Sequence, residues 1–283
     1  MERRRLGKTN EELSVIGFGG LAVRDMTPDE AAETVARAVK RGINYFDVAP
    51  SYGNAEERLG PALEPFRDDV FLACKTGQRD AAGAESDLHQ SLQRLRTDHF
   101  DLYQCHGVSS VEEAERILAP GGALETFVRA RDAGTVRHIG FSAHSEAAAL
   151  KLLDGFPFES VLMPFNLFCW EDGNFGRAVL EKAGQTQTGV LALKSLARRP
   201  WEEGEDKTWP KCWYRPVEAL REATTLLDFT LCLPVTAAVS PGHAELLWLA
   251  CDAAEALANG TAERATKHEI TGAPLFKTGP GST

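Results

Sequence analysis

Four side chains with acid–base chemistry lie near the ends of successive apolar segments. Asp47 lies near the end of segment 44–49 and Tyr52 follows it, while Lys75 and His106 lie near the ends of the next two segments. If these segments are neighbouring parallel strands of a barrel, their carboxyl ends meet at one rim. We therefore expect a carboxylate, a phenol, an amine and an imidazole to converge on one site.

This set of groups suits acid catalysis of carbonyl reduction. A phenol has a reference pKa of about 10, and we expect a neighbouring ammonium to lower it. Asp47 would keep Lys75 charged, so that Tyr52 could donate a proton to a carbonyl oxygen. His106 could donate a hydrogen bond to the same oxygen. No side chain supplies a hydride, so the chemistry implies a nicotinamide cofactor.

Three other functions are compatible with parts of this pattern. Lys75 could form a Schiff base in an aldolase, but the neighbouring carboxylate and phenol favour a charged lysine. A metal-dependent hydrolase could use Asp47, His106, His138 and His144, but the sequence has no His-x-His pair. The non-enzymatic alternative is a redox-sensing or regulatory subunit that binds the cofactor with little turnover.

The elements that must position these groups alternate strictly. We predict eight strand–helix units between residues 13 and 258, which favours a single-domain (β/α)₈ TIM barrel over residues 1–258 with a short N-terminal hairpin. The clearest helix, at 27–42, has Thr27 and Glu30 in capping-box spacing. The tail at 259–283 is rich in Gly, Pro and Thr, and we expect it to be partly disordered. The predicted strands are 13–20, 44–49, 69–77, 100–107, 137–144, 160–166, 189–196 and 235–242. The predicted helices are 27–42, 55–66, 84–96, 122–134, 145–156, 175–185, 216–229 and 244–258.

The composition excludes several classes of function. The chain has 283 residues, of which 43% are apolar and 25% charged, and its net charge of −10 without a basic stripe argues against nucleic-acid binding. No apolar run reaches the roughly 18 residues of a membrane span, and the basic start is not followed by a signal-peptide core. Six scattered cysteines predict reduced thiols, a cytoplasmic location and no metal site. We expect a monomer or a small homo-oligomer.

Several segments resemble the aldo-keto reductase family. They are "RRLGKTNEELSVIGFGG", "GINYFDVAPSYGNAEERLGPAL", "VFLACKTG", "DLYQCHG", "GTVRHIGFSAHS" and "VSPG". The resemblance implies a (β/α)₈ barrel that binds NADP(H) across the strand ends and acts on a small carbonyl or alcohol substrate. It also implies that Asp47, Tyr52, Lys75 and His106 are the catalytic tetrad, with Tyr52 as the proton donor.

The segments expected to bind the cofactor match the family less closely than the tetrad segments do. Ser142 matches the family's Ser, His144 is a candidate for the role of the following Asn, and Leu162 and Leu193 replace a usual Gln and a stacking aromatic. Trp248 stands where the family often has an Arg for the 2′-phosphate, so NAD(H) is an alternative to NADP(H). The cofactor-binding residues that we predict are Gly20, Ser142, His144, Lys194, Leu196, Arg198, Ser240, Gly242, Trp248 and Asp252.

One long insertion, at 197–216, follows the seventh predicted strand. Its aromatic residues predict a lid over the substrate, with Trp201, Trp209 and Trp213 as substrate-binding residues. The alternative is a loop that these aromatics hold against the barrel.

Overall fold

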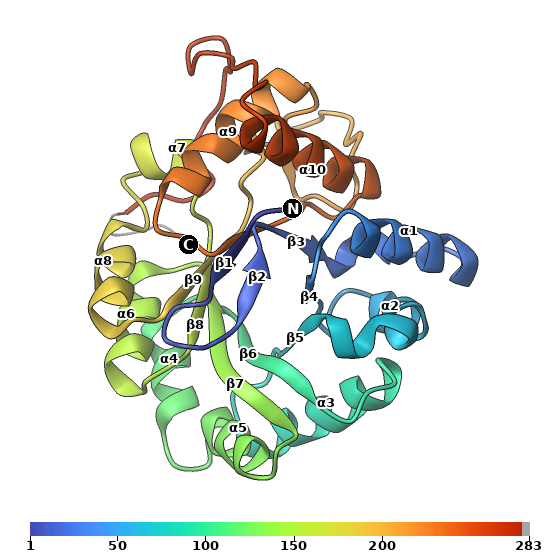
Figure 1. Cartoon of the computed structure of the whole chain (residues 1–283). Coiled ribbons are helices and arrows are strands. Elements are labelled where there is room, and N and C mark those ends of the chain that lie inside the picture. Colours follow the sequence, from blue (N-terminus) through green and yellow to red (C-terminus); the bar gives the residue numbers. More distant parts are fainter. Residues whose placement is uncertain (279–283) are drawn as a thin grey trace.

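A closed parallel barrel forms the centre of the molecule. The computed structural model describes residues 1–278, and within this range eight strands close in the order β12-β3-β4-β5-β6-β7-β8-β9, each parallel to its neighbours (Figure 1). The predicted (β/α)₈ barrel is therefore confirmed. The barrel strands are β3 (Ile16–Gly19), β4 (Tyr45–Asp47), β5 (Phe71–Thr76), β6 (Phe100–Val108), β7 (Val136–Ala143), β8 (Ser160–Met163), β9 (Gly189–Ala192) and β12 (Ala237–Val239).

Helices surround the barrel and follow its strands (Figure 1). Two α-helices, α4 and α7, and most of the 3₁₀ helix η1 lie in segments where we predicted no element. The predicted helix at 55–66 ends at residue 63 and continues as a 3₁₀ turn. The helices are η1 (Gly20–Val23), α1 (Pro28–Lys40), α2 (Ala55–Leu63), η2 (Glu64–Asp69), α3 (Ala81–Arg94), α4 (Val111–Leu118), α5 (Ala123–Asp132), α6 (Glu146–Gly155), α7 (Leu167–Glu171), α8 (Arg177–Thr186), α9 (Leu220–Cys232) and α10 (Ala244–Ala258).

Helix α1 begins where its sequence signals predict. The Thr27 hydroxyl accepts a hydrogen bond from the Glu30 backbone N–H, and the Glu30 carboxylate accepts one from the Thr27 backbone N–H at 2.8 Å. Two of the amides that a helix start leaves unpaired are satisfied in this way. Pro28 occupies the first turn, where its missing N–H costs nothing.

The predicted N-terminal hairpin closes one end of the barrel. Strands β1 (Arg3–Arg5) and β2 (Glu12–Ser14) pair antiparallel. Leu6 and Leu13 are fully buried, and they pack with side chains that line the barrel interior. The hairpin therefore plugs the end of the barrel at which the strands begin.

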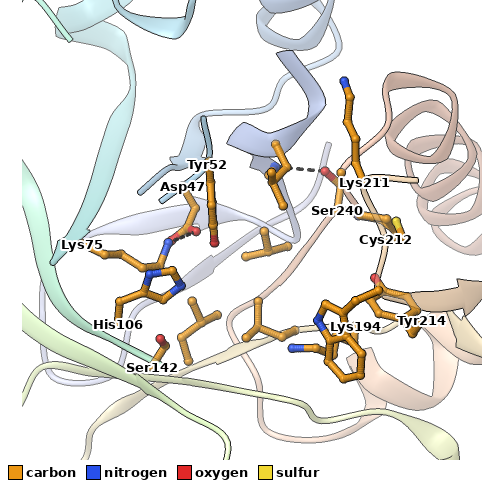
Figure 2. Close-up of a pocket in the computed structure, with 18 of the residues that line it drawn as sticks. Asp47, Tyr52, Lys75, His106, Ser142, Lys194, Lys211, Cys212, Tyr214 and Ser240 are labelled. Carbon is orange, nitrogen blue, oxygen red and sulfur yellow. Dashed lines mark hydrogen bonds and ion pairs between the residues drawn. The ribbon is translucent and has the colours of Figure 1, made fainter. Parts of the chain in front are cut away.

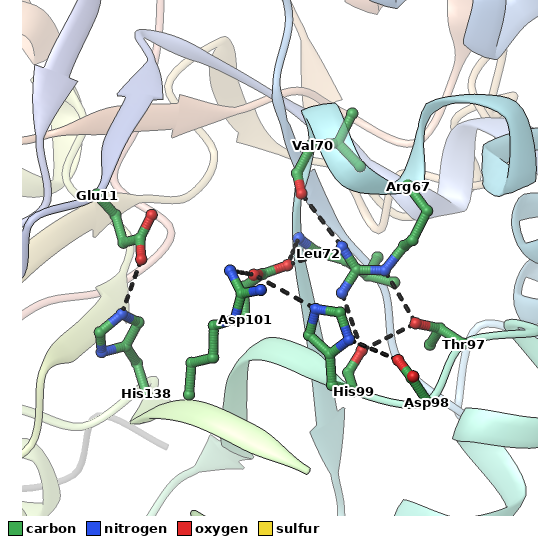
Figure 3. Close-up of polar contacts among 10 residues, drawn as sticks. Glu11, Arg67, Val70, Leu72, Thr97, Asp98, His99, Asp101 and His138 are labelled. Atoms are coloured by element: carbon green, nitrogen blue, oxygen red, sulfur yellow. Dashed lines mark hydrogen bonds and ion pairs between the residues drawn. The ribbon is translucent and has the colours of Figure 1, made fainter. Parts of the chain in front are cut away.

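A polar network ties the strands together at this closed end (Figure 3). Asp101, at the start of β6, is 3% exposed and pairs with Arg67 at 3.0 Å and with Arg137 at 2.9 Å. Its carboxylate also accepts a hydrogen bond from the Leu72 backbone N–H at 2.8 Å. Because one carboxylate joins η2, β5, β6 and β7, we interpret the network as structural.

The insertion after β9 is a short hairpin rather than an irregular loop. Strands β10 (Ala197–Pro200) and β11 (Tyr214–Pro216) pair antiparallel. Between them, the Glu205 carboxylate pairs with Arg199 at 2.8 Å and with Arg215 at 2.7 Å. These ion pairs fix the connecting segment over the open end of the barrel.

The tail is packed against the barrel as far as the structure describes it. Ala265 and Ile270 are buried, and the Ala273 backbone N–H donates to the Arg198 carbonyl at 2.9 Å. The Phe276 ring stacks on His144 with 5.2 Å between ring centroids. Disorder was predicted within 259–283; residues 259–278 have defined contacts, and 279–283 lie outside the described residues.

Candidate active site

A cavity of about 190 Å³ lies where the barrel strands end (Figure 2). Asp47, Tyr52, Lys75 and His106 all line it, so the structure brings the predicted tetrad together. The other lining residues are Gly19, Leu21, Ser142, His144, Leu162, Leu193, Lys194, Lys211, Cys212, Trp213, Tyr214, Val239, Ser240, Pro241 and Gly242.

A buried ion pair forms the base of the site. The Lys75 ammonium pairs with Asp47, and the two side chains are 1% and 2% exposed. The second carboxylate oxygen accepts hydrogen bonds from the Tyr45 hydroxyl at 3.1 Å and from Gln104 Nε2 at 3.2 Å, and the ammonium also donates to the Val48 carbonyl at 3.3 Å. Burial, the largest single influence, lowers the Lys75 pKa, but the charges of Asp47 and Tyr52 and the hydrogen bond to Asp47 together outweigh it, so the net shift is upward. The lysine therefore stays charged.

Tyr52 lies beside this pair and also lines the cavity. Lys75 Nζ is 5.5 Å from the centroid of the Tyr52 ring, and the His106 ring approaches edge-on with centroids 5.6 Å apart. Burial raises the Tyr52 pKa by more than the charge of Lys75 lowers it. The prediction of a lowered Tyr52 pKa is therefore wrong, because it weighed the ammonium and not the loss of water. The phenol keeps its proton, as a proton donor must.

His106 is neutral in this setting. Burial, together with the charges of Lys75, Arg79 and Lys194, lowers its pKa to about 3. Its Nδ1 lies 3.4 Å from the Ser51 hydroxyl. A neutral imidazole has one N–H to donate, so His106 can offer a hydrogen bond to a substrate oxygen without giving up a proton.

The two cavity histidines give a testable pH dependence of stability. Burial and the charge of Lys194 also lower the His144 pKa to about 3, while an unfolded histidine has a pKa of about 6.5. Between these two pKa values the unfolded chain binds more protons than the folded one. The free energy of unfolding should therefore be highest above about pH 6.5 and should decrease as the pH drops below that value. Urea unfolding at about pH 7 and about pH 5 should show a smaller loss in a variant with both His106→Gln and His144→Gln; an equal loss would contradict this origin.

Two serines that we predicted for the cofactor line the cavity. Ser142 Oγ accepts a hydrogen bond from the Gly107 backbone N–H at 2.7 Å, and Ser240 Oγ accepts one from the Gly19 backbone N–H at 3.0 Å. These bonds fix the positions of the two oxygens. Each hydroxyl hydrogen remains available for a ligand.

The start of α10 offers anion donors beside Gly242. Within the described residues, His243 at the N-cap makes no side-chain capping bond, so the first N–H groups of the helix lack a side-chain acceptor. A Cβ at Gly242 would come within 2.9 Å of Leu21 Cβ and 3.2 Å of Lys211 Cβ, so only glycine fits. These donors suit the phosphates of a dinucleotide. The cavity is smaller than the roughly 300–1,000 Å³ of most ligand pockets, so only part of a dinucleotide fits inside it.

Other predicted cofactor residues point elsewhere. Arg198 forms an ion pair with Glu222 of α9. The Trp248 ring lies under the Arg37 guanidinium, 4.1 Å from the ring centroid, and Leu196 is fully buried in the core. The cavity, as the described residues form it, is not lined by these three side chains.

Gly20 and Asp252 also lie outside the lining of the cavity in the described chain. The Asp252 carboxylate accepts a hydrogen bond from Arg41, the C-cap residue of α1, at 2.7 Å. A Cβ at Gly20 would come within 2.9 Å of Val48, so this glycine allows η1 to pack closely on the chain after β4. Gly20 thus lets η1 pack on the chain after β4, and Asp252 links α10 to the end of α1.

The three tryptophans of the insertion have different environments. Trp201 Nε1–H donates to the Cys212 carbonyl at 2.8 Å, and the Trp209 ring packs edge-on against His243 at 5.0 Å. Trp213 is 53% exposed and lines the cavity. Within the described residues, only Trp213 of the three lines the cavity, and the other two hold the segment in place.

The structure adds residues that the sequence did not single out. Lys211 and Cys212 reach the cavity from the insertion, and Phe276 lies beside His144 from the tail. Their positions follow from the path of irregular segments, for which the sequence has no periodic signal. The aromatic content of the insertion was the one available hint.

Residues 1–278 contain no group of three or more His, Cys, Asp or Glu side chains placed to hold a metal ion. Over the same range, no helix combines the length and the apolar character that crossing a bilayer would require.

Comparison with known proteins places the chain in a family. The model of the aldo/keto reductase family matches residues 15–261. The aldo-keto reductase YhdN of Bacillus subtilis is 31% identical over 221 residues, which are 70% of this chain and 63% of that relative. YqkF of the same species, described as an uncharacterized oxidoreductase, is 29% identical over 182 residues, 59% of this chain and 57% of the relative. The matches thus span about three fifths of these relatives' lengths.

A solved structure shows the same fold over almost the whole chain. The holo form of the aldo-keto reductase AKR11C1 from Bacillus halodurans superimposes with a TM-score of 0.73 and 22% sequence identity, covering 95% of this chain and 94% of its own. At this identity the likeness shows the fold. The match of the family model over residues 15–261 establishes that the chain belongs to the aldo/keto reductase family.

Proposed function

We propose that this protein is an NAD(P)H-dependent reductase of small aldehydes or ketones, with Tyr52 as the proton donor. The observation that carries the proposal is the buried Asp47–Lys75 ion pair against Tyr52, with His106 edge-on to the phenol, at one cavity. The relative YhdN is named an aldo-keto reductase, which supports the same activity.

Each tetrad residue has a distinct part in this chemistry. Asp47 holds the Lys75 ammonium beside the phenol, and the ammonium stabilises negative charge on the Tyr52 oxygen as its proton leaves. The proton moves from the Tyr52 hydroxyl to the carbonyl oxygen of the substrate. Neutral His106 donates a hydrogen bond that orients that oxygen. A reduced nicotinamide, when bound, would supply the hydride to the carbonyl carbon.

The cofactor that we propose is NADP(H), with NAD(H) as the alternative. Ser142 and the donors around Ser240, Gly242 and the start of α10 are the groups that would hold it. Both cofactors are considered because Trp248 stands where the family often has an arginine that binds the 2′-phosphate of NADP(H). The neighbour AKR11C1 is described in a holo form, which is consistent with a bound cofactor in this fold.

The test is a turnover assay with both reduced cofactors. We expect loss of NADPH or NADH absorbance when the protein is mixed with an aromatic aldehyde such as nitrobenzaldehyde. Fluorescence titration of each reduced cofactor would measure the two dissociation constants separately. Cofactor binding without oxidation by any member of an aldehyde and ketone panel would contradict the reductase and favour the regulatory subunit.

A further inference from the structure

One of the three lysines that line the cavity has no oxygen partner. Lys75 pairs with Asp47, and the Lys211 ammonium donates to the Ala22 carbonyl at 3.2 Å and the Arg24 carbonyl at 2.6 Å. Among the described residues, the Lys194 ammonium contacts only a nitrogen, His144 Nε2 at 3.2 Å. An ammonium has three N–H donors, so two remain free.

This free ammonium is held inside the cavity wall. Lys194 is 8% exposed, and no carboxylate of residues 1–278 lies within ion-pair distance of it. Burying an unpaired charge is costly, so the position is expected to have a compensating role. Its backbone adds to that cost, because Lys194 has a φ of 60°, in the left-handed region that side chains other than Gly, Asn and Asp rarely adopt.

Flat apolar walls flank the ammonium. Lys194 Nζ lies 5.3 Å from the centroid of the Trp213 ring and 5.6 Å from that of Phe276. The Phe276 ring in turn stacks on His144. An anionic group at Lys194 would therefore be attached to a flat or apolar body lying between aromatic rings.

Lys194 faces the tetrad across the cavity and is apart from Lys211. Its charge contributes to the lowered pKa of His106, whereas the charge of Lys211 acts on His243 at the start of α10. Figure 2 shows Lys211 near Ser240 and Lys194 near Tyr214, with the tetrad opposite. The phosphate donors at α10 and the free ammonium are thus separate features, and the second can serve a molecule whose carbonyl meets Tyr52.

We infer that Lys194, with His144, binds an anionic oxygen group of the substrate, so that the preferred substrates are carbonyl acids: aldehydes or ketones that also carry a carboxylate. The inference rests on the proposed reductase activity and assigns to Lys194 and His144 a partner other than the cofactor. Two free N–H donors match the two oxygens of a carboxylate. The aromatic walls match an aromatic or short apolar link between the carboxylate and the carbonyl.

The kinetic test compares 4-formylbenzoate with its neutral methyl ester. We expect the wild type to favour the acid in kcat/KM, and Lys194→Met to reduce that acid-to-ester ratio by about 10- to 100-fold, the contribution of charge-assisted hydrogen bonds. Lys207→Met is the matched control, because it removes a lysine that is exposed in the same insertion and absent from the cavity lining. The control should keep the wild-type ratio, and an equal fall in both variants would contradict a local site.

The binding test does not depend on turnover. Trp213 lies beside Lys194, so 4-formylbenzoate should quench its fluorescence, with or without oxidised cofactor, and Lys194→Met should weaken that binding. No quenching in the wild type, in either state, would overturn the inference. Thermal unfolding of Lys194→Met should show no loss of stability, since the substitution removes a buried unpaired charge.

The outcomes separate this inference from the proposed function. A wild type that reduces acid and ester equally well would overturn the anion site and leave the reductase standing. No turnover with any carbonyl, together with Lys194-dependent quenching, would overturn the reductase and leave the site. A weaker cofactor dissociation constant in Lys194→Met with an unchanged acid-to-ester ratio would assign the ammonium to the cofactor phosphates and overturn the inference.

Discussion

Tyr52→Phe is expected to lower kcat for aldehyde reduction by about 10²- to 10⁴-fold, the usual contribution of a positioned general acid. The substitution removes one hydroxyl and keeps the ring that packs beside His106 and Lys75. The cofactor dissociation constant should therefore stay close to the wild-type value. Steady-state kinetics and fluorescence titration of the reduced cofactor measure the two quantities.

Tyr103→Phe is the matched control for this experiment. The Tyr103 hydroxyl is buried without a hydrogen-bond partner among the described residues, and the residue does not line the cavity. Its removal should leave kcat unchanged. If Tyr52→Phe were as active as this control, the proton would have to come from another group.

Lys75→Met is expected to abolish reduction and to lower the free energy of unfolding by about 3–5 kcal/mol. The loss of stability follows because the Asp47 carboxylate, 2% exposed, would be left without its counter-charge. Tyr45 and Gln104 would still donate hydrogen bonds to Asp47, but both donors are neutral and cannot balance the charge of the carboxylate. Urea unfolding gives the stability, and the turnover assay gives the activity.

A double variant separates the two effects. Asp47→Asn combined with Lys75→Met removes both charges, so much of the lost stability should return. Activity should stay low, because the ammonium that stabilises the Tyr52 oxygen is still missing. A double variant with wild-type turnover would show that the ion pair serves the fold alone.

The sequence predicts the convergence of Asp47, Tyr52, Lys75 and His106 because their positions depend on regular elements. Asp47, Lys75 and His106 lie at or near the ends of strands, and alternating strands and helices bring those ends to one rim. The hairpin at the N-terminus and the start of α1 also follow from local signals. Regular hydrogen-bonding patterns and short-range capping rules thus determine this part of the structure.

Other features depend on distances that no local pattern encodes. The Tyr52 pKa rises because of burial, whose extent is set by the assembled barrel. Lys211 reaches the cavity and Phe276 lies beside His144, both on irregular segments, and the pairing of Arg198 with Glu222 joins segments that only the folded chain brings together. The lid prediction for the insertion was made from aromatic content, which did not distinguish Trp213 from Trp201.

The N-terminal hairpin affects how ligands can enter and leave the cavity. Leu6 and Leu13 fill the end of the barrel opposite the cavity, so in the described residues that end offers no route to Tyr52 along the barrel axis. Substrate and product would therefore both pass through the cavity side of the barrel. Slow release of product would delay binding of the next substrate, so we expect product release to limit the rate of turnover.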